Sequence, residues 1–135
     1  MIRSVSTSQH QILKNIMALY NAGKPFDLDP TYSTGRFYQH GVPGPRLAHD
    51  IAPSSTDVRY ADVRSLPLLS GSIGSAVFDP PFLVGTSFKT SVMGLRYGGF
   101  EKWPEYNAFI AGALICHPCL SCLLVIPGCR FWLSL

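Results

Sequence analysis

Two stretches of the chain have the sequence features of α-helices. In residues 8–22 the apolar side chains recur at the spacing of an α-helix, at Ile12, Ile16, Leu19 and Tyr20. Ser8 or Thr7 can cap the start of this helix, and Gly23 can close its end. Residues 101–114 predict a second helix.

Between the two helices, short apolar runs lead into acidic residues. The runs span residues 26–28, 46–49, 58–61 and 73–78, and the acids that follow them are Asp29, Asp50, Asp62 and Asp79. Short apolar runs without clean alternation are typical of strands buried on both faces, as in a parallel sheet. Each acid alone has an ordinary explanation as a turn residue. Together they predict an α/β fold whose mostly parallel sheet carries the acids along one edge, where open α/β sheets bind ligands.

The fourth acid begins a specific tetrapeptide, Asp79-Pro80-Pro81-Phe82. The exocyclic amine of a nucleobase is a poor nucleophile, because its lone pair is conjugated into the ring. The Asp79 carboxylate and the Pro80 carbonyl can accept hydrogen bonds from the two N–H groups and so localise that lone pair. The two prolines fix the backbone, and Phe82 offers a face for stacking an extruded base. The tetrapeptide resembles the Asp/Asn-Pro-Pro-Tyr/Phe signature of S-adenosylmethionine-dependent amino-methyltransferases, above all those that act on adenine or cytosine in DNA.

Upstream segments resemble cofactor motifs of that family in the same order. In the family, the first strand ends in Asp-Pro and continues as Phe-x-Gly-x-Gly; residues 26–35 resemble this form but keep only the last glycine. The resemblance implies that residues of this segment wrap the methionine part of the cofactor: Asp29, Pro30, Thr31 and Gly35. It also implies that Asp50 accepts from the ribose hydroxyls and that Asp62 accepts from the adenine amine.

The resemblance implies a Rossmann-like class I methyltransferase. Such an enzyme transfers a methyl group from S-adenosylmethionine to an exocyclic amine of a DNA base, most often adenine, without a metal. It would work in the cytoplasm of a bacterium or a phage-infected cell. Related tetrapeptides occur in methylases of RNA guanine and of protein glutamine, so the acceptor is inferred from resemblance. Residues 83–103 mix basic side chains, such as Lys89 and Arg96, with aromatic ones, and form either a DNA-facing loop or an ordinary surface loop.

Composition divides the chain into two parts. The whole is 47% hydrophobic and 14% charged with a net charge of +3, which permits a polyanionic partner without requiring one. The part before Cys116 has no cysteine, and the N-terminus lacks the apolar core of a secretory signal, as in a cytoplasmic protein. No charged side chain lies between Tyr106 and Cys129. We therefore expect a partial methyltransferase catalytic domain at residues 1–114 and a non-homologous, apolar, cysteine-rich tail at residues 115–135.

The tail has three interpretations. A metal site would use His117 or the thiols of Cys116, Cys119, Cys122 and Cys129, but their spacing is not that of known zinc knuckles. A membrane-spanning helix would be broken by Pro118 and Pro127. A shifted reading frame or truncation fits best and predicts a sheet that is incomplete at the C-terminus, with weak or no activity of the chain alone. The alternative function is therefore a catalytically inactive remnant that at most binds nucleic acid.

Overall fold

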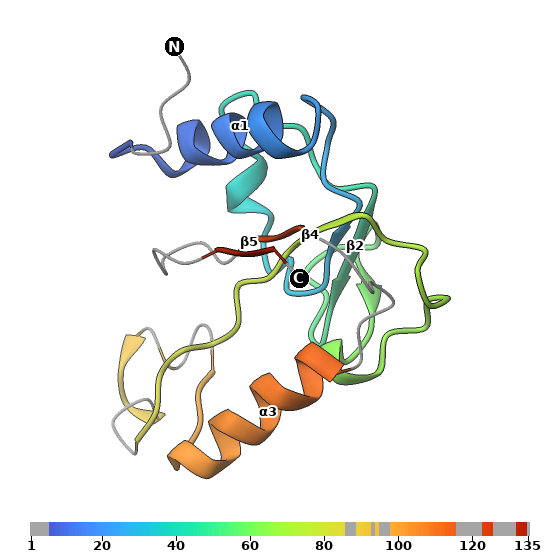
Figure 1. Cartoon of the computed structure of the whole chain (residues 1–135). Helices are drawn as coiled ribbons and strands as arrows, with labels where there is room; N and C mark the ends of the chain where they lie inside the picture. The colour runs from blue at the N-terminus through green and yellow to red at the C-terminus, as the bar shows by residue number, and fades with distance from the viewer. Residues whose placement is uncertain are drawn as a thin grey trace.

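The strands form one sheet at the centre of the molecule (Figure 1). The structure is a computed structural model that describes residues 6–85, 89–92, 94, 98–115, 123–125 and 132–134. Its strands are β1 (Leu28–Asp29), β2 (Leu47–Asp50), β3 (Arg59–Tyr60), β4 (Ser75–Val77), β5 (Leu123–Val125) and β6 (Trp132–Ser134). They lie in the order β3-β2-β1-β4-β5-β6, with all neighbours parallel except the antiparallel pair β5 and β6. The predicted α/β fold with a mostly parallel sheet is confirmed.

Both predicted helices are present. They are α1 (Gln9–Tyr20) and α3 (Trp103–Ile115), and two short 3-10 helices, η1 (Arg36–Tyr38) and η2 (Val63–Ser65), lie in the loops. The Ser8 side chain caps α1 by accepting from the Gln11 amide at 3.4 Å. Gly23, at φ 73°, donates its amide to the Met17 carbonyl at 2.9 Å and so closes the helix, as predicted.

Alternate residues of β4 and of the position that follows it enter two separate apolar cores. Ala76 and Phe78 belong to the core on the α3 side, whereas Val77 belongs to the core on the α1 side. The buried members of the first core are Leu28, Ala61, Val63, Leu66, Ile73, Ala76, Phe78 and Ala113. Those of the second are Leu13, Met17, Phe26, Val42 and Val77. The sheet is therefore covered by α1 on one face and by α3 on the other, as Figure 1 shows.

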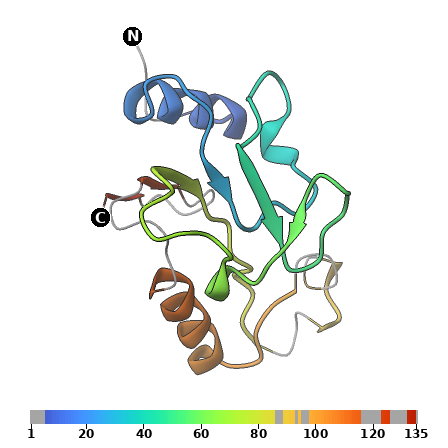
Figure 2. The ribbon, with the colours of Figure 1, turned by 90° about the vertical axis from the view of Figure 1, so that its right-hand side faces the viewer.

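The strand β3 is less buried than the sequence pattern indicates. Figure 2 shows β1, β2 and β3 side by side, with β3 at the edge of the sheet. Its two residues, Arg59 and Tyr60, are exposed, and only the flanking Val58 and Ala61 are buried. An edge strand has one neighbour and needs fewer apolar contacts, so residues 58–61 are not buried on both faces.

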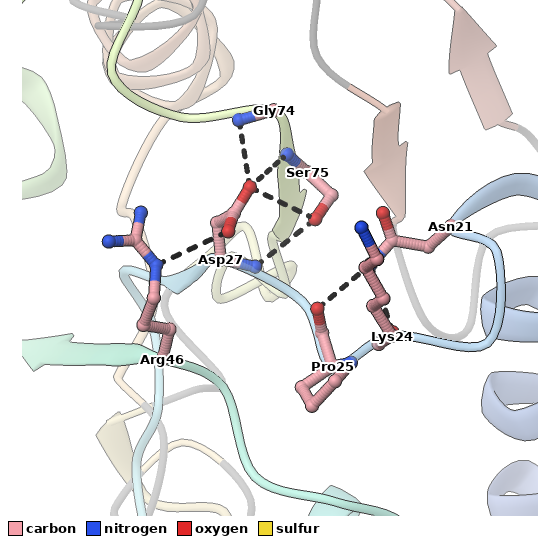
Figure 3. A network of polar contacts seen from close by, with 7 residues as sticks. All are labelled: Asn21, Lys24, Pro25, Asp27, Arg46, Gly74 and Ser75. Atoms are coloured by element: carbon pink, nitrogen blue, oxygen red, sulfur yellow. Dashed lines mark hydrogen bonds and ion pairs between the residues drawn. The ribbon is translucent and has the colours of Figure 1, made fainter.

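A carboxylate ties the amino ends of three strands together (Figure 3). The Asp27 carboxylate accepts from the amides of Gly74 and Ser75, at 2.9 and 3.1 Å, and forms an ion pair with Arg46 at 3.3 Å. The Asp27 amide in turn donates to the Ser75 carbonyl at 3.0 Å. Because these residues precede or begin β1, β2 and β4, the network fixes the three strands at the end opposite to the predicted acidic edge.

Candidate functional site

The parallel topology brings the predicted acids to one edge of the sheet. Asp29 and Asp50 are the last residues of β1 and β2, while Asp62 and Asp79 follow β3 and β4 by two residues. From β1 the chain passes to β2 and β3 on one side, then returns to β4 on the other side of β1. The carboxyl edge between β1 and β4 is thus a topological switch point, the place at which open α/β sheets bind ligands.

Asp29 is completely buried, and both oxygens of its carboxylate accept hydrogen bonds from the chain itself. One oxygen, Oδ1, accepts from the Thr31 amide at 2.9 Å and from the Thr31 hydroxyl at 3.4 Å. The other, Oδ2, accepts from the Tyr38 hydroxyl at 2.7 Å. Burial raises the pKa of Asp29 to about 6, although the bonds from Tyr38 and Thr31 lower it, and the nearby charge of Asp79 adds to the rise. Asp29 is therefore a structural acid that organises the loop following β1.

Asp79 lies beside this loop and is connected to it through its backbone. The Asp79 amide donates to the Thr31 hydroxyl oxygen at 2.9 Å. Partial burial raises the pKa of the Asp79 carboxyl to about 6. Among the residues that the structure describes, no side chain or amide donates a hydrogen bond to this carboxylate. The predicted catalytic acid and the predicted cofactor loop are thus in direct contact.

The rest of the tetrapeptide separates into buried and exposed parts. Pro80 is buried and Pro81 half-buried. The Phe82 side chain is 61% exposed, unusually open for a large aromatic residue. Its ring therefore has a free face at the surface, next to the end of β4.

The loop after β1 adopts left-handed backbone conformations at two positions. Ser33 has φ 53° and Gly35 has φ 67°. For Ser33 this conformation is unfavourable, because Cβ approaches the backbone. The carboxylate of Asp50 supports it: Oδ2 accepts from the Ser33 amide at 2.7 Å, and Oδ1 accepts from the Ala52 amide at 2.8 Å. Asp50 thus fixes the loop, and each of its oxygens keeps a lone pair for a further donor.

Tyr32 and Tyr38 pack on the same loop, although no role was predicted for either. The rings of Tyr32 and Tyr38 stack with centroids 5.5 Å apart, and the Tyr32 ring lies so close to Gly35 that a Cβ there would be 2.5 Å from the Tyr32 hydroxyl oxygen. Gly35 is therefore required by both φ and space. Burial and the charge of Asp29 raise the pKa of Tyr38, so its hydroxyl stays a donor. In the sequence, only the aromatic stretch at residues 37–38 signals this packing.

A small hollow adjoins Tyr32 on the side of β2. It has a volume of about 220 Å³ and is lined by Tyr32, Gly44, Pro45, Arg46, Ala48, Ser55, Asp57 and Val58. None of the predicted site residues lines it. The predicted site is therefore the edge of the sheet around Asp29, Asp50 and Asp79 rather than this hollow.

The carboxylate of Asp62 is engaged by Arg64. Oδ1 accepts from the Arg64 amide at 2.9 Å and caps η2, and the guanidinium forms an ion pair with Oδ2 at 2.6 Å. These bonds from Arg64 lower the pKa of Asp62. Arg64 also lies over the Phe109 ring of α3, 5.7 Å from its centroid. Asp62 therefore links η2 to α3, and an incoming amine would share its carboxylate with Arg64.

The segment after the tetrapeptide is anchored to the start of α3. The Phe100 amide donates to the Leu83 carbonyl, and the Gly85 amide donates to the Phe100 carbonyl, both at 2.8 Å. Lys89 forms an exposed ion pair with Glu101. The positive charge of Lys89, expected to face DNA, is thus partly neutralised by Glu101 of the same segment. The other basic residue named for this loop, Arg96, lies outside the described residues.

The residues of the predicted metal site lie outside the described part of the chain: Cys116, His117, Cys119, Cys122 and Cys129. In the part of the chain that the structure describes, no three His, Cys, Asp or Glu side chains gather as a metal site would require. Within that part, too, no helix is long and apolar enough to cross a bilayer. The interpretations of the tail, and the domain boundary after residue 114, stay predictions.

No protein-family model, no curated protein and no solved structure matches this chain.

Proposed function

We propose that the chain catalyses methyl transfer from S-adenosylmethionine to an exocyclic amine of a DNA base, with adenine as the favoured acceptor. The observation that carries the proposal is the contact between two motifs from distant parts of the sequence. The Asp79 amide donates to the Thr31 hydroxyl at 2.9 Å, so the tetrapeptide and the loop after β1 adjoin at the switch point. Methyl transfer needs this proximity, because the methyl donor and the amine must meet in line.

The backbone of the loop supports the same proposal. In the family that the sequence resembles, glycines stand at the positions of Ser33 and Gly35. Both residues here have the positive φ that glycine favours, at 53° and 67°. A backbone suited to glycine at both positions supports the proposal, although serine stands at residue 33.

Most of the polar groups along this edge of the sheet fit the proposed cofactor. The loop that Asp29 organises would hold its methionine part through Pro30, Thr31 and Gly35, and Asp50 has lone pairs for the ribose hydroxyls. Asp62 would accept from the adenine amine only by sharing its carboxylate with Arg64. When bound, S-adenosylmethionine supplies an electrophilic methyl group.

The buried Asp29 and the half-buried Asp79 have different roles. The oxygens of Asp29 are occupied by Thr31 and Tyr38, which leaves the Asp79 carboxylate to bind the amine with the Pro80 carbonyl. With its pKa raised to about 6, Asp79 is ionised in roughly nine of ten molecules at neutral pH and accepts an N–H bond. Transfer of the methyl group would form the N–C bond, break the S–CH3 bond of the sulfonium and leave a neutral thioether. The nitrogen would then release one proton, for which this carboxylate is a suitable acceptor. The exposed ring of Phe82 would stack on the base.

A second candidate function, an inactive remnant that at most binds nucleic acid, is favoured by two contacts. Tyr32 covers Gly35, and Arg64 occupies Asp62. Both place the chain's own side chains against groups that the cofactor would contact.

Transfer of a tritiated methyl group from S-adenosylmethionine to unmethylated DNA distinguishes the two functions. We expect weak incorporation by the full chain and its loss in Asp79→Ala. Asp57→Ala is the matched control, because it removes the same charge from an exposed loop. Absence of incorporation by the wild-type chain, or equal activity in Asp79→Ala, would contradict the proposal.

A further inference from the structure

We propose that the Thr31 hydroxyl is a positioning group that sets the location of the two substrate acceptors, the Asp79 carboxylate and the Pro80 carbonyl. This inference rests on the proposed function. The hydroxyl oxygen accepts from the Asp79 amide at 2.9 Å, and the hydroxyl proton points to Asp29 Oδ1 at 3.4 Å. Thr31 therefore joins the buried carboxylate of one loop to the backbone of the other.

The hydrogen bond of the Asp79 amide strongly affects the orientation of the tetrapeptide backbone. The strand β4 ends at Val77, so the sheet no longer holds the backbone at residue 79. Pro80 and Pro81 have no N–H, and Asp79 is therefore the last residue before Phe82 that can donate a backbone hydrogen bond. With the proline φ angles fixed, an anchor at the Asp79 amide orients the Pro80 carbonyl as well.

The anchor itself is rigidly held. The Thr31 amide donates to Asp29 Oδ1 at 2.9 Å, and the Asp29 carboxylate is completely buried. A threonine side chain has few χ1 choices, which adds to this order. The resembled motif has phenylalanine at the position of Thr31, and phenylalanine cannot accept a hydrogen bond from the Asp79 amide. The connection therefore belongs to this chain's own sequence.

The position of the acceptors affects the rate more than the affinity for the methyl donor. Loss of the Thr31 hydroxyl leaves the backbone of residues 31–35 and the Asp50 carboxylate in place. It frees the Asp79 amide, so the amine would be held less often in the reactive orientation. One neutral hydrogen bond of this kind corresponds to a change of about tenfold in kcat.

Three variants of the full chain test this role. Thr31→Val removes the hydroxyl and keeps the shape, whereas Thr31→Ser keeps the hydroxyl. Tyr38→Phe is the matched control, because it removes a different hydrogen bond to the same carboxylate of Asp29. We expect kcat to fall about tenfold in Thr31→Val with a KM for S-adenosylmethionine within about twofold of wild type, and Thr31→Ser to restore most of the rate. The role is refuted if Thr31→Val changes KM alone, if Thr31→Ser is as slow as Thr31→Val, or if Tyr38→Phe gives the same loss of kcat.

Hydrogen–deuterium exchange of the Asp79 amide tests the bond without any activity. The exchange should be about tenfold or more faster in Thr31→Val than in wild type, and near wild type in Thr31→Ser and Tyr38→Phe. Equal exchange in Thr31→Val and wild type would overturn the inference. If the wild-type chain transfers no methyl group, the proposed function fails, whereas the exchange rates still decide whether Thr31 holds Asp79.

Discussion

Replacing the buried Asp29 by asparagine should change how stability depends on pH. Burial raises the pKa of Asp29 from its ordinary 3.8 to about 6, so the folded chain binds the proton more tightly than the unfolded chain. The stability due to the protonated carboxyl is fully present below about pH 4 and is lost as the pH rises through about 6. Asparagine has nearly the same shape and does not ionise, so it abolishes this loss.

The magnitude follows from the change in pKa. One pKa unit corresponds to about 1.4 kcal/mol, so ionised Asp29 costs the folded chain about 3 kcal/mol at neutral pH. The side chain is completely buried, and solvent does not screen the cost. About 2 kcal/mol of it develops between about pH 4.5 and pH 7.5. The free energy of unfolding of Asp29→Asn minus that of wild type should therefore rise by about 2 kcal/mol from about pH 4.5 to pH 7.5. Altered bonds to Thr31 and Tyr38 would shift this difference by the same amount at both pH values and do not affect the rise.

Urea unfolding followed by far-ultraviolet circular dichroism, at both pH values, measures this difference. Asp57→Asn serves as the control, since Asp57 is exposed and its replacement should leave the pH dependence of wild type unchanged. The reasoning is refuted if wild type and Asp29→Asn differ by the same free energy at both pH values. It is also refuted if the difference changes in the opposite direction.

Three further predictions follow from the loops. Asp27→Ala should lower the free energy of unfolding by about 2–3 kcal/mol in a urea titration, because the Gly74 and Ser75 amides lose a charged acceptor; a change below about 0.5 kcal/mol would argue against the network of Figure 3. Ser33→Gly should raise the free energy of unfolding by up to about 1 kcal/mol, because it relieves the left-handed φ, and thermal melting would reveal a loss instead. Lys89→Ala should lower the slope of log affinity for DNA against log salt by about one if residues 83–103 contact phosphates, and an unchanged slope would exclude Lys89 from the interface.

Much of the fold could be predicted because the local signals agree. Apolar runs followed by aspartates located β1, β2 and β4 within two or three residues, and Ser8 and Gly23 marked the ends of α1. The edge position of β3 was missed, because Val58 and Ala61 give a short strand an apolar appearance although Arg59 and Tyr60 face solvent. Strand order cannot be read from such runs.

The placement of the acids could be predicted, but the division of their roles could not. The apolar runs that end in Asp29 and Asp79 place both acids at one edge of the sheet. The hydrogen bond to Asp29 Oδ2, in contrast, comes from Tyr38 in η1. The pairing of Asp62 with Arg64 depends on a side-chain rotamer. Such contacts are set by loop geometry, for which residues 30–38 carry no regular pattern.

Isothermal titration of S-adenosylmethionine into the full chain tests most directly whether this edge holds the methyl donor. We expect one binding site per chain, with affinity reduced about tenfold or more in Asp50→Ala through the loss of a charged acceptor for the ribose hydroxyls, and wild-type affinity in Asp57→Ala. No binding by the wild-type chain, or equal affinity in Asp50→Ala and wild type, would contradict the assignment of this edge as the cofactor site.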